Sequence, residues 1–163
     1  MCDNVCLMAQ EMGMLILRAP SATELPALTD LCLRSKAVWG YDRAFMEACR
    51  DELTLKPEDL RETKLQVAER DGAVVGVAQI SADGAVAHLE KLFIEPDQLR
   101  SGAGRALLAW AQHAAAEVGA THLVIEADPE AAPFYRRMGA RDDGVAPSGS
   151  IAGRLLPRLV LAL

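Results

Sequence analysis

The sequence predicts a single α/β domain of the α+β type, in which helices cover a mostly antiparallel sheet. β-rich runs at residues 65–70, 73–81 and 85–95 are separated by Asp71-Gly72 and Asp83-Gly84, which are typical of hairpin turns, so they form an antiparallel meander. Beyond residue 102 the apolar residues recur at helical spacing instead, as far as Gly119. A chain of 163 residues is long enough to bury one hydrophobic core.

Further elements are expected on either side of this region. They are a strand at 14–19, a helix from the capping-box pattern at Ser21 to about Ser35, a helix at 42–53, a buried strand at 122–127, a helix from Asp128 or one turn later to Gly139, and a last strand at 154–163. We therefore expect an N-terminal extension, residues 1–13, followed by one domain, residues 14–163.

Composition argues against several classes of function. A net charge of −6 leaves no basic stripe for a nucleic acid. The four cysteines form no C-x-x-C pair and have no histidines at ligand spacing, so we expect free thiols and no metal. Residues 1–13 do not resemble a signal peptide, and no apolar stretch approaches the roughly 18 residues of a membrane span. The expectation is a cytoplasmic protein with no membrane or nucleic-acid partner.

The most informative segment is Leu99-Arg100-Ser101-Gly102-Ala103-Gly104-Arg105, which follows a strand and opens a helix. Glycines let the backbone approach an anion, and the free N–H groups and dipole of the first helical turn favour phosphate. Taken alone, the pattern also fits a simple helix cap. It is not a Walker loop, and a dinucleotide fingerprint would need a third glycine where Leu107 stands.

Two motifs together resemble a known family. The run Leu92-Phe93-Ile94-Glu95-Pro96, followed by the segment 99–105, resembles motif A of the GNAT N-acetyltransferases, roughly L-x-V-x-P and then [QR]-x-x-G-x-[GA]. Downstream, Asp128-x-x-Ala131-x-x-Phe134-Tyr135-x-x-x-Gly139-Ala140 is similar to the family's N-x-x-A-x-x-x-Y-x-x-x-G-F segment. The order of expected elements also matches, from Leu15 to Leu163. The chain departs from the family pattern at Leu99, which replaces Gln or Arg, and at Asp128, which replaces Asn.

The resemblance implies a fold and a cofactor. A GNAT domain has a mixed, mostly antiparallel sheet of about six or seven strands and about four helices on both faces. Two neighbouring strands, here 85–95 and 122–127, splay apart to admit the pantetheine arm of acetyl-CoA. The implied pantetheine-binding residues are Leu92, Phe93 and Ile94; those for the pyrophosphate are Leu99, Arg100, Ser101, Gly102, Ala103, Gly104 and Arg105. Asp128 starts the second motif, but a carboxylate near an acidic cofactor is unfavourable, so a helix-capping role is the alternative.

Catalytic candidates follow from the chemistry of acetyl transfer, which needs a base for the acceptor ammonium and an acid for the leaving thiolate. Tyr135 matches a family position near the sulfur, which implies the acid. Strand alternation predicts His88, Glu90, Leu92 and Ile94 on one face. Glu90 is the first candidate for the base and His88 the second, although both also fit ordinary structural roles.

Two segments are expected to shape the acceptor site. Lys36, Trp39 and Tyr41 end the first helix, and Ser148 and Ser150 lie in the loop before the last strand. Their surroundings, S-K-x-x-W-G-Y and P-S-G-S-I, resemble segments of a GNAT subgroup without an assigned substrate. Lys36 is a candidate ligand for the carboxylate of an amino-acid acceptor.

Three functions remain open from the sequence. The first is acetylation of a primary amine of a small molecule or amino acid, by direct transfer in a ternary complex. The others are acetylation of a protein or peptide, and a catalytically silent acetyl-CoA-binding domain. A homodimer is a further expectation, through pairing of the apolar last strand across a two-fold axis.

Overall fold

The computed structural model describes residues 13–163 and shows one seven-stranded sheet with strand order β1-β2-β3-β4-β5-β7-β6. The strands are β1 (Leu15–Arg18), β2 (Lys64–Arg70), β3 (Ala73–Asp83), β4 (Val86–Ile94), β5 (His122–Glu126), β6 (Arg141–Pro147) and β7 (Leu155–Ala162). The helices are α1 (Leu25–Ala37), α2 (Arg43–Leu53), α3 (Asp59–Glu62), α4 (Ala103–Glu117) and α5 (Ala132–Arg137), with 3-10 turns at Ala22–Glu24 and Pro96–Gln98. Every neighbouring pair of strands is antiparallel except β4 and β5, so the predicted fold class is confirmed.

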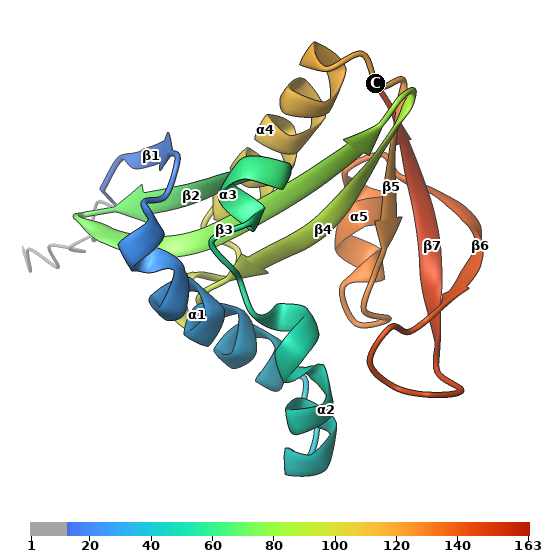
Figure 1. Ribbon diagram of the computed structural model, residues 1–163, viewed down its shortest axis with the longest axis horizontal. Helices are drawn as coiled ribbons and strands as arrows, with labels where there is room; N and C mark the ends of the chain where they lie inside the picture. The colour runs from blue at the N-terminus through green and yellow to red at the C-terminus, as the bar shows by residue number, and fades with distance from the viewer. Residues whose placement is uncertain (1–12) are drawn as a thin grey trace, which may run out of the picture.

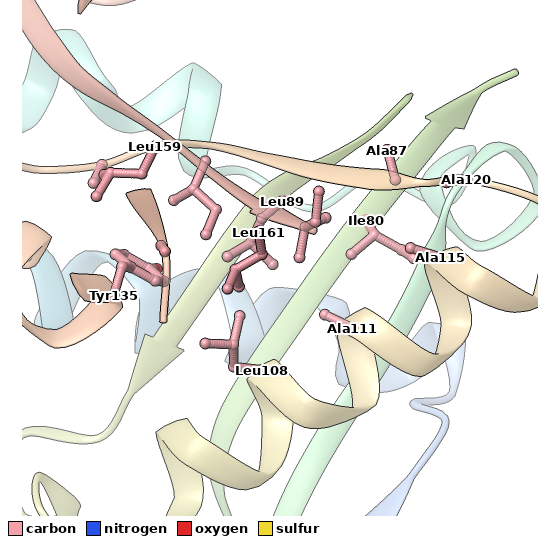
Figure 2. Packing of buried hydrophobic residues seen from close by; sticks show 14 of the residues in the cluster. Ile80, Ala87, Leu89, Leu108, Ala111, Ala115, Ala120, Tyr135, Leu159 and Leu161 are labelled. Atoms are coloured by element: carbon pink, nitrogen blue, oxygen red, sulfur yellow. The ribbon is translucent and has the colours of Figure 1, made fainter. Parts of the chain in front are cut away.

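Helices cover both faces of the sheet (Figure 1). On one face α1 and α2 bury an apolar cluster against β2 and β3 that includes Leu28, Cys49 and Val77. On the other face α4 and α5 share a second cluster with β3, β4, β5 and β7. In Figure 2 Leu108 and Ala111 of α4 face this sheet surface, and Tyr135 of α5 lies near Leu159 of β7.

Gly76 in the middle of β3 explains how closely α4 approaches the sheet. A Cβ atom there would lie 2.7 Å from Cδ1 of Ile94 and 2.9 Å from Cδ1 of Leu107, closer than real contacts allow. The absent side chain therefore lets α4 settle on β3 and β4, which places the start of α4 beside the end of β4.

The strand pair β4 and β5 diverges along its length. Their parallel pairing runs from Val86 with His122 to Leu89 with Ile125 and goes no further. Figure 1 shows the two strands separating towards their carboxyl ends, with β4 turning towards α1. The splay that the family resemblance implied is therefore present.

A β-bulge interrupts β4 where the strands separate. Gln79 of β3 pairs with Lys91 while the next residue, Ile80, pairs with Leu89, so Glu90 is the extra residue. A bulge reverses the alternation of side chains beyond it. Leu89 packs with the α4 cluster before the bulge, and Leu92 and Ile94 pack on that same side after it. The prediction that His88, Glu90, Leu92 and Ile94 share one face is therefore wrong.

The C-terminal region differs from expectation in two respects. β6 (Arg141–Pro147) was not predicted. Ala146 is the one buried residue in it, so no apolar alternation is visible, and Gly144 and Pro147 are untypical of a strand. β7 lies between β5 and β6, so the last strand is not the free edge on which the dimer expectation relied. Of the predicted extension, residues 1–12 lie outside the described part, together with Cys2 and Cys6; Cys32 and Cys49 are free and buried.

Candidate active site

The diverging strands leave the carboxyl-terminal half of β4 without a partner on its β5 side. Leu92, Phe93 and Ile94, the predicted pantetheine-binding residues, lie in this half, beyond the last pair with β5. Backbone groups on an unpaired strand edge are free to bond an extended ligand. The geometry therefore suits an arm that lies along β4 as an added strand would.

The segment Leu99–Arg105, called here the phosphate loop, turns directly into α4. Gly102 is the N-cap residue and has a φ angle of +91°, a conformation that favours glycine. The first helical bond runs from the N–H of Ala106 to the carbonyl of Gly102 at 3.0 Å. Among the described residues, the N–H groups of positions 102–105 have no backbone acceptor and are left for a ligand, whereas that of Ser101 donates to the carbonyl of Gln98 at 3.3 Å. The helix dipole favours an anion at this point.

The phosphate loop contains a buried polar atom without a partner. The hydroxyl of Ser101 is the single buried side-chain oxygen or nitrogen within residues 13–163 that has no hydrogen bond. Arg70, buried at the end of β2, holds the loop from behind: it donates to the carbonyl of Ser101 at 3.0 Å and to Oε1 of Gln98 at 2.9 Å. Arg70 thus fixes the loop, while the Ser101 hydroxyl and the N–H groups of residues 102–105 stay free.

These features fit a phosphate group. Free N–H groups at a helix start, the partnerless hydroxyl of Ser101 and the exposed cations Arg100 and Arg105 together match an anionic ligand. A Cβ atom at Gly104 would lie 3.5 Å from the ring of Phe134, an ordinary contact, so the packing of α5 does not require glycine there. Leu99 is exposed, so its departure from the family's Gln or Arg removes no buried contact.

Tyr135 lies on α5, buried within the cluster that α5 shares with β5 and β7. Burial raises the pKa of its phenol well above the ordinary value, so the group is protonated at neutral pH. Its hydroxyl donates to no atom of the described residues and is not among the fully buried oxygens that lack a partner. It is therefore a free proton donor.

Glu90 and His88 occupy the β4 segment at which the strands begin to part. The exposed carboxylate of Glu90, the bulge residue, accepts a 2.6 Å hydrogen bond from Ser81 of β3. Ser81 is also the register partner of the half-buried His88. The bulge therefore brings both candidate bases beside one serine, away from the face on which Leu92 and Ile94 lie.

A polar cluster, called here the Asp128 cluster, forms where β5 ends and consists of Lys36, Tyr41, Phe45, Asp128 and Arg154. The Tyr41 hydroxyl donates to Oδ2 of Asp128 at 2.7 Å, and Arg154 donates to the Tyr41 oxygen at 2.7 Å. Nζ of Lys36 lies 3.5 Å and Nη2 of Arg154 3.6 Å from the same Oδ2 atom. Segments from α1, the α1–α2 loop, the end of β5 and the start of β7 therefore meet at one carboxylate.

The electrostatics of this cluster are mutually supporting. Burial would raise the pKa of Asp128, but the hydrogen bonds from Tyr41 and the Glu130 N–H and the charges of Lys36 and Arg154 outweigh it and hold that pKa below its usual value. Burial and the bond to Asp128 raise the pKa of Tyr41 to about 12. The cluster thus contains two cations, a carboxylate and a neutral phenol at neutral pH.

The sequence suggested a capping role for Asp128 at the following helix, but Asp128 is not the N-cap residue of α5. α5 starts at Ala132 with Ala131 as its N-cap, and Oδ1 of Asp128 accepts from the N–H of Glu130 at 3.0 Å, inside the preceding turn. The residue therefore fixes the turn after β5 with one oxygen and the cluster with the other. Two of its neighbours, Lys36 and Tyr41, are residues that the sequence predicted for the acceptor.

The other residues predicted for the acceptor, Ser148, Ser150 and Trp39, are not members of the Asp128 cluster. Oγ of Ser148 accepts from the N–H groups of Ser150 and Ile151, and Ser150 donates to Glu52 of α2, so both serines fasten the β6–β7 loop. Trp39 is 41% exposed and takes no part in the Asp128 cluster. The structure therefore brings Lys36 and Tyr41 together at Asp128, while the two serines form hydrogen bonds that hold the β6–β7 loop.

Sequence reasoning missed three residues that matter here. Arg154 and Phe45 complete the Asp128 cluster, and Arg70 supports the phosphate loop. Arg154 stands four residues after Ser150, the second serine of P-S-G-S-I, so this arginine could have been included among the candidates of that loop. Arg70 gave no signal beyond being an arginine at the end of a predicted strand.

Comparison with known proteins assigns this geometry to a class of transferase. A model of the acetyltransferase (GNAT) domain matches residues 27–146, most of the chain. The chain belongs to the GNAT acetyltransferase family. It is an acyltransferase domain that uses acetyl-CoA, as the motifs predicted. No curated protein gives a significant match.

Solved structures agree on the fold. A GCN5-related N-acetyltransferase from Rhodopseudomonas palustris has a TM-score of 0.78 at 21% identity, over 93% of this chain and 98% of that one. The PaiA N-acetyltransferase from Thermoplasma acidophilum, in complex with coenzyme A, has a TM-score of 0.76 at 17% identity, over 92% and 99%. A GNAT acetyltransferase from Elizabethkingia anophelis with acetyl-CoA bound has 0.66 at 15%, over 91% and 98%.

None of the helices within residues 13–163 has the length and apolar character to cross a membrane. In the same residues no group of three or more His, Cys, Asp or Glu side chains is arranged to hold a metal ion.

Proposed function

We propose that this chain is an N-acetyltransferase that moves the acetyl group of acetyl-CoA to a primary amine of a small molecule or amino acid, by direct transfer within a ternary complex. The observation that carries the proposal is the end of β4–β5 pairing at Leu89 and Ile125, with the phosphate loop at the end of the same β4 strand. We propose a cytoplasmic location on the sequence arguments alone. The proposal of a homodimer rests on the family resemblance alone, because β7 lies between β5 and β6 and offers no free edge.

The acceptor must lose a proton before it can attack. An alkylammonium group with a pKa near 10.4 is only about 0.04% neutral at pH 7, which costs about 4 to 5 kcal/mol. Glu90 is the proposed base, directly or through water, since it is an exposed carboxylate at the point where β4 leaves β5. His88, the register partner of the same serine, is the second candidate.

Acetyl-CoA supplies the acetyl group as an activated thioester. The free backbone edge of Leu92–Ile94 is proposed to bind the pantetheine arm, and its N–H groups would polarise the thioester carbonyl. The neutral Tyr135 phenol would donate a proton to the departing sulfur, for which its unengaged hydroxyl is suited. The phosphate loop would hold the pyrophosphate through main-chain N–H groups.

The cofactor half of the proposal is tested by a thermal-shift titration. Acetyl-CoA at about 100 times its Kd should add about 2.7 kcal/mol of stability, or about 5–10 °C in melting temperature, whereas ATP and NAD should not. No shift at millimolar acetyl-CoA would refute the proposal.

The catalytic half is tested with isosteric variants in a screen of amines. Tyr135→Phe should lower kcat about 100-fold, because a general acid contributes that much, yet leave the melting temperature nearly unchanged, because no partner of the hydroxyl is lost. Glu90→Gln should lower kcat/KM for the amine about 100-fold, whereas His88→Gln should lower it much less. The opposite pattern would make His88 the base. Full activity in both Tyr135→Phe and Glu90→Gln would exclude these roles.

A further inference from the structure

The Asp128 cluster carries an excess of positive charge in a largely dry place. Lys36 and Arg154 have side-chain exposures of 14% and 19%, and the single carboxylate between them is 11% exposed. A half-buried charge without a counter-ion is costly, because little water remains to solvate it. One further negative charge would balance the cluster.

The two cations also keep unused hydrogen-bond donors. Of the five N–H groups of the Arg154 guanidinium, only those on Nη2 have partners within residues 13–163, namely Tyr41 and, at 3.6 Å, Asp128. Lys36 makes a single long contact of 3.5 Å. The planar fork of an arginine matches the two oxygens of a carboxylate, so Arg154 is equipped for a second, bidentate partner.

The aromatic rings of the cluster are already engaged by these cations. Tyr41 and Phe45 stack with their centroids 4.0 Å apart. The Arg154 guanidinium lies 4.9 Å from the Phe45 ring, and Nζ of Lys36 lies 5.6 Å from the Tyr41 ring. A cationic ligand group would be repelled by both of these charges.

We propose that the acceptor carries a carboxylate near its primary amine, and that Arg154, assisted by Lys36, binds that carboxylate. The inference rests on the proposed acetyl transfer and narrows its acceptor to small amino acids. Tyr41 and Asp128 act as positioning residues, because their hydrogen bonds fix the guanidinium. Asp128 stands two residues beyond β5, so the carboxylate lies at the β5 side of the gap and the amine points towards β4.

The first experiment compares acceptors that differ in one group. Amino acids are assayed against their own amides and against the amines left by decarboxylation, with acetyl-CoA saturating. The acid should be acetylated with a kcat/KM at least about 30-fold higher than that of its amide. The carboxylate of the acid neutralises the excess charge of Arg154 and Lys36, whereas the neutral amide would leave that charge unpaired. Diamines should be the poorest acceptors.

The second experiment removes the cations one at a time. Arg154→Gln should reduce the preference for acid over amide at least about 30-fold, mainly through the KM of the acid, and Lys36→Gln should reduce it less. Arg43→Gln, an exposed arginine at the start of α2, is the matched control and should retain the full preference. The Kd of acetyl-CoA, measured separately, should stay the same in all three variants.

A binding measurement decides the inference independently of turnover. Calorimetric titration of the amino acid into the complex with coenzyme A should show saturable binding that Arg154→Gln weakens by the same factor. Amides accepted as well as acids, or an acid that binds equally to Arg154→Gln, would overturn the carboxylate site while leaving acetyl transfer intact. Failure to bind acetyl-CoA at all would instead overturn the proposed function, and the inference with it.

Discussion

The two sides of the gap between β4 and β5 are built in different ways. The β4 side consists of a free strand edge and the phosphate loop, so its binding groups are main-chain N–H and C=O groups from one continuous stretch of chain. The β5 side is the Asp128 cluster, made of charged and aromatic side chains from five separate segments. Backbone recognition tolerates sequence change and suits a cofactor common to a family, whereas side-chain recognition suits an acceptor that differs between members.

The largest effect that would distinguish the sides is the loss of the Asp128 carboxylate. Asp128→Ala removes the acceptor of the Tyr41 bond and leaves Lys36 and Arg154 facing each other, so we expect the free energy of unfolding to fall by about 2–4 kcal/mol. Urea unfolding at pH 7 measures this. The exposed Asp51→Ala on α2 is the control and should change stability by no more than about 0.5 kcal/mol.

The charge of Asp128 also predicts a pH dependence of stability. Its pKa in the folded chain is lowered from 3.8, so the carboxylate contributes its full stability above that unfolded value and loses it as the pH falls through the lower folded pKa. The difference in stability between the natural chain and Asp128→Asn should therefore shrink as the pH falls below about 4. A difference that stays constant down to pH 2 would show that shape, not charge, holds the cluster together.

The contrast between the sides also explains what the sequence could and could not predict. Leu92–Ile94 and the phosphate loop lie within 14 consecutive residues, so their pattern was legible along the chain. Arg154 meets Tyr41 across 113 residues, and no local pattern encodes that contact. The face of Glu90 was misassigned because a bulge depends on how β3 and β4 pair, and an exposed strand such as β6 has no apolar alternation to reveal it.

A backbone change should affect the β4 side alone. Gly102 has a φ angle of +91°, so Gly102→Ala strains the loop by about 1–2 kcal/mol although no atom lies in the way, and we expect the Kd of acetyl-CoA to rise about tenfold. Gly104→Ala adds the same methyl group where the backbone is helical and the contacts are ordinary, so it should change the Kd less than about threefold. Equal effects at the two glycines would show that the loop holds the cofactor by space and not by backbone conformation.

The smallest effect is also the most specific one, because it should have opposite signs in the free and bound protein. The buried Ser101 hydroxyl has no partner, so Ser101→Ala should leave the free energy of unfolding unchanged or raise it by less than about 1 kcal/mol. We expect this hydroxyl to donate to a phosphate oxygen of acetyl-CoA. Ser101→Ala should then weaken acetyl-CoA binding about threefold to tenfold, a typical cost of one lost hydrogen bond. Thermal melting with and without acetyl-CoA measures both quantities in one experiment. A loss of stability without any loss of affinity would mean that the hydroxyl serves the fold, and the donors of the loop would then be its main-chain N–H groups alone.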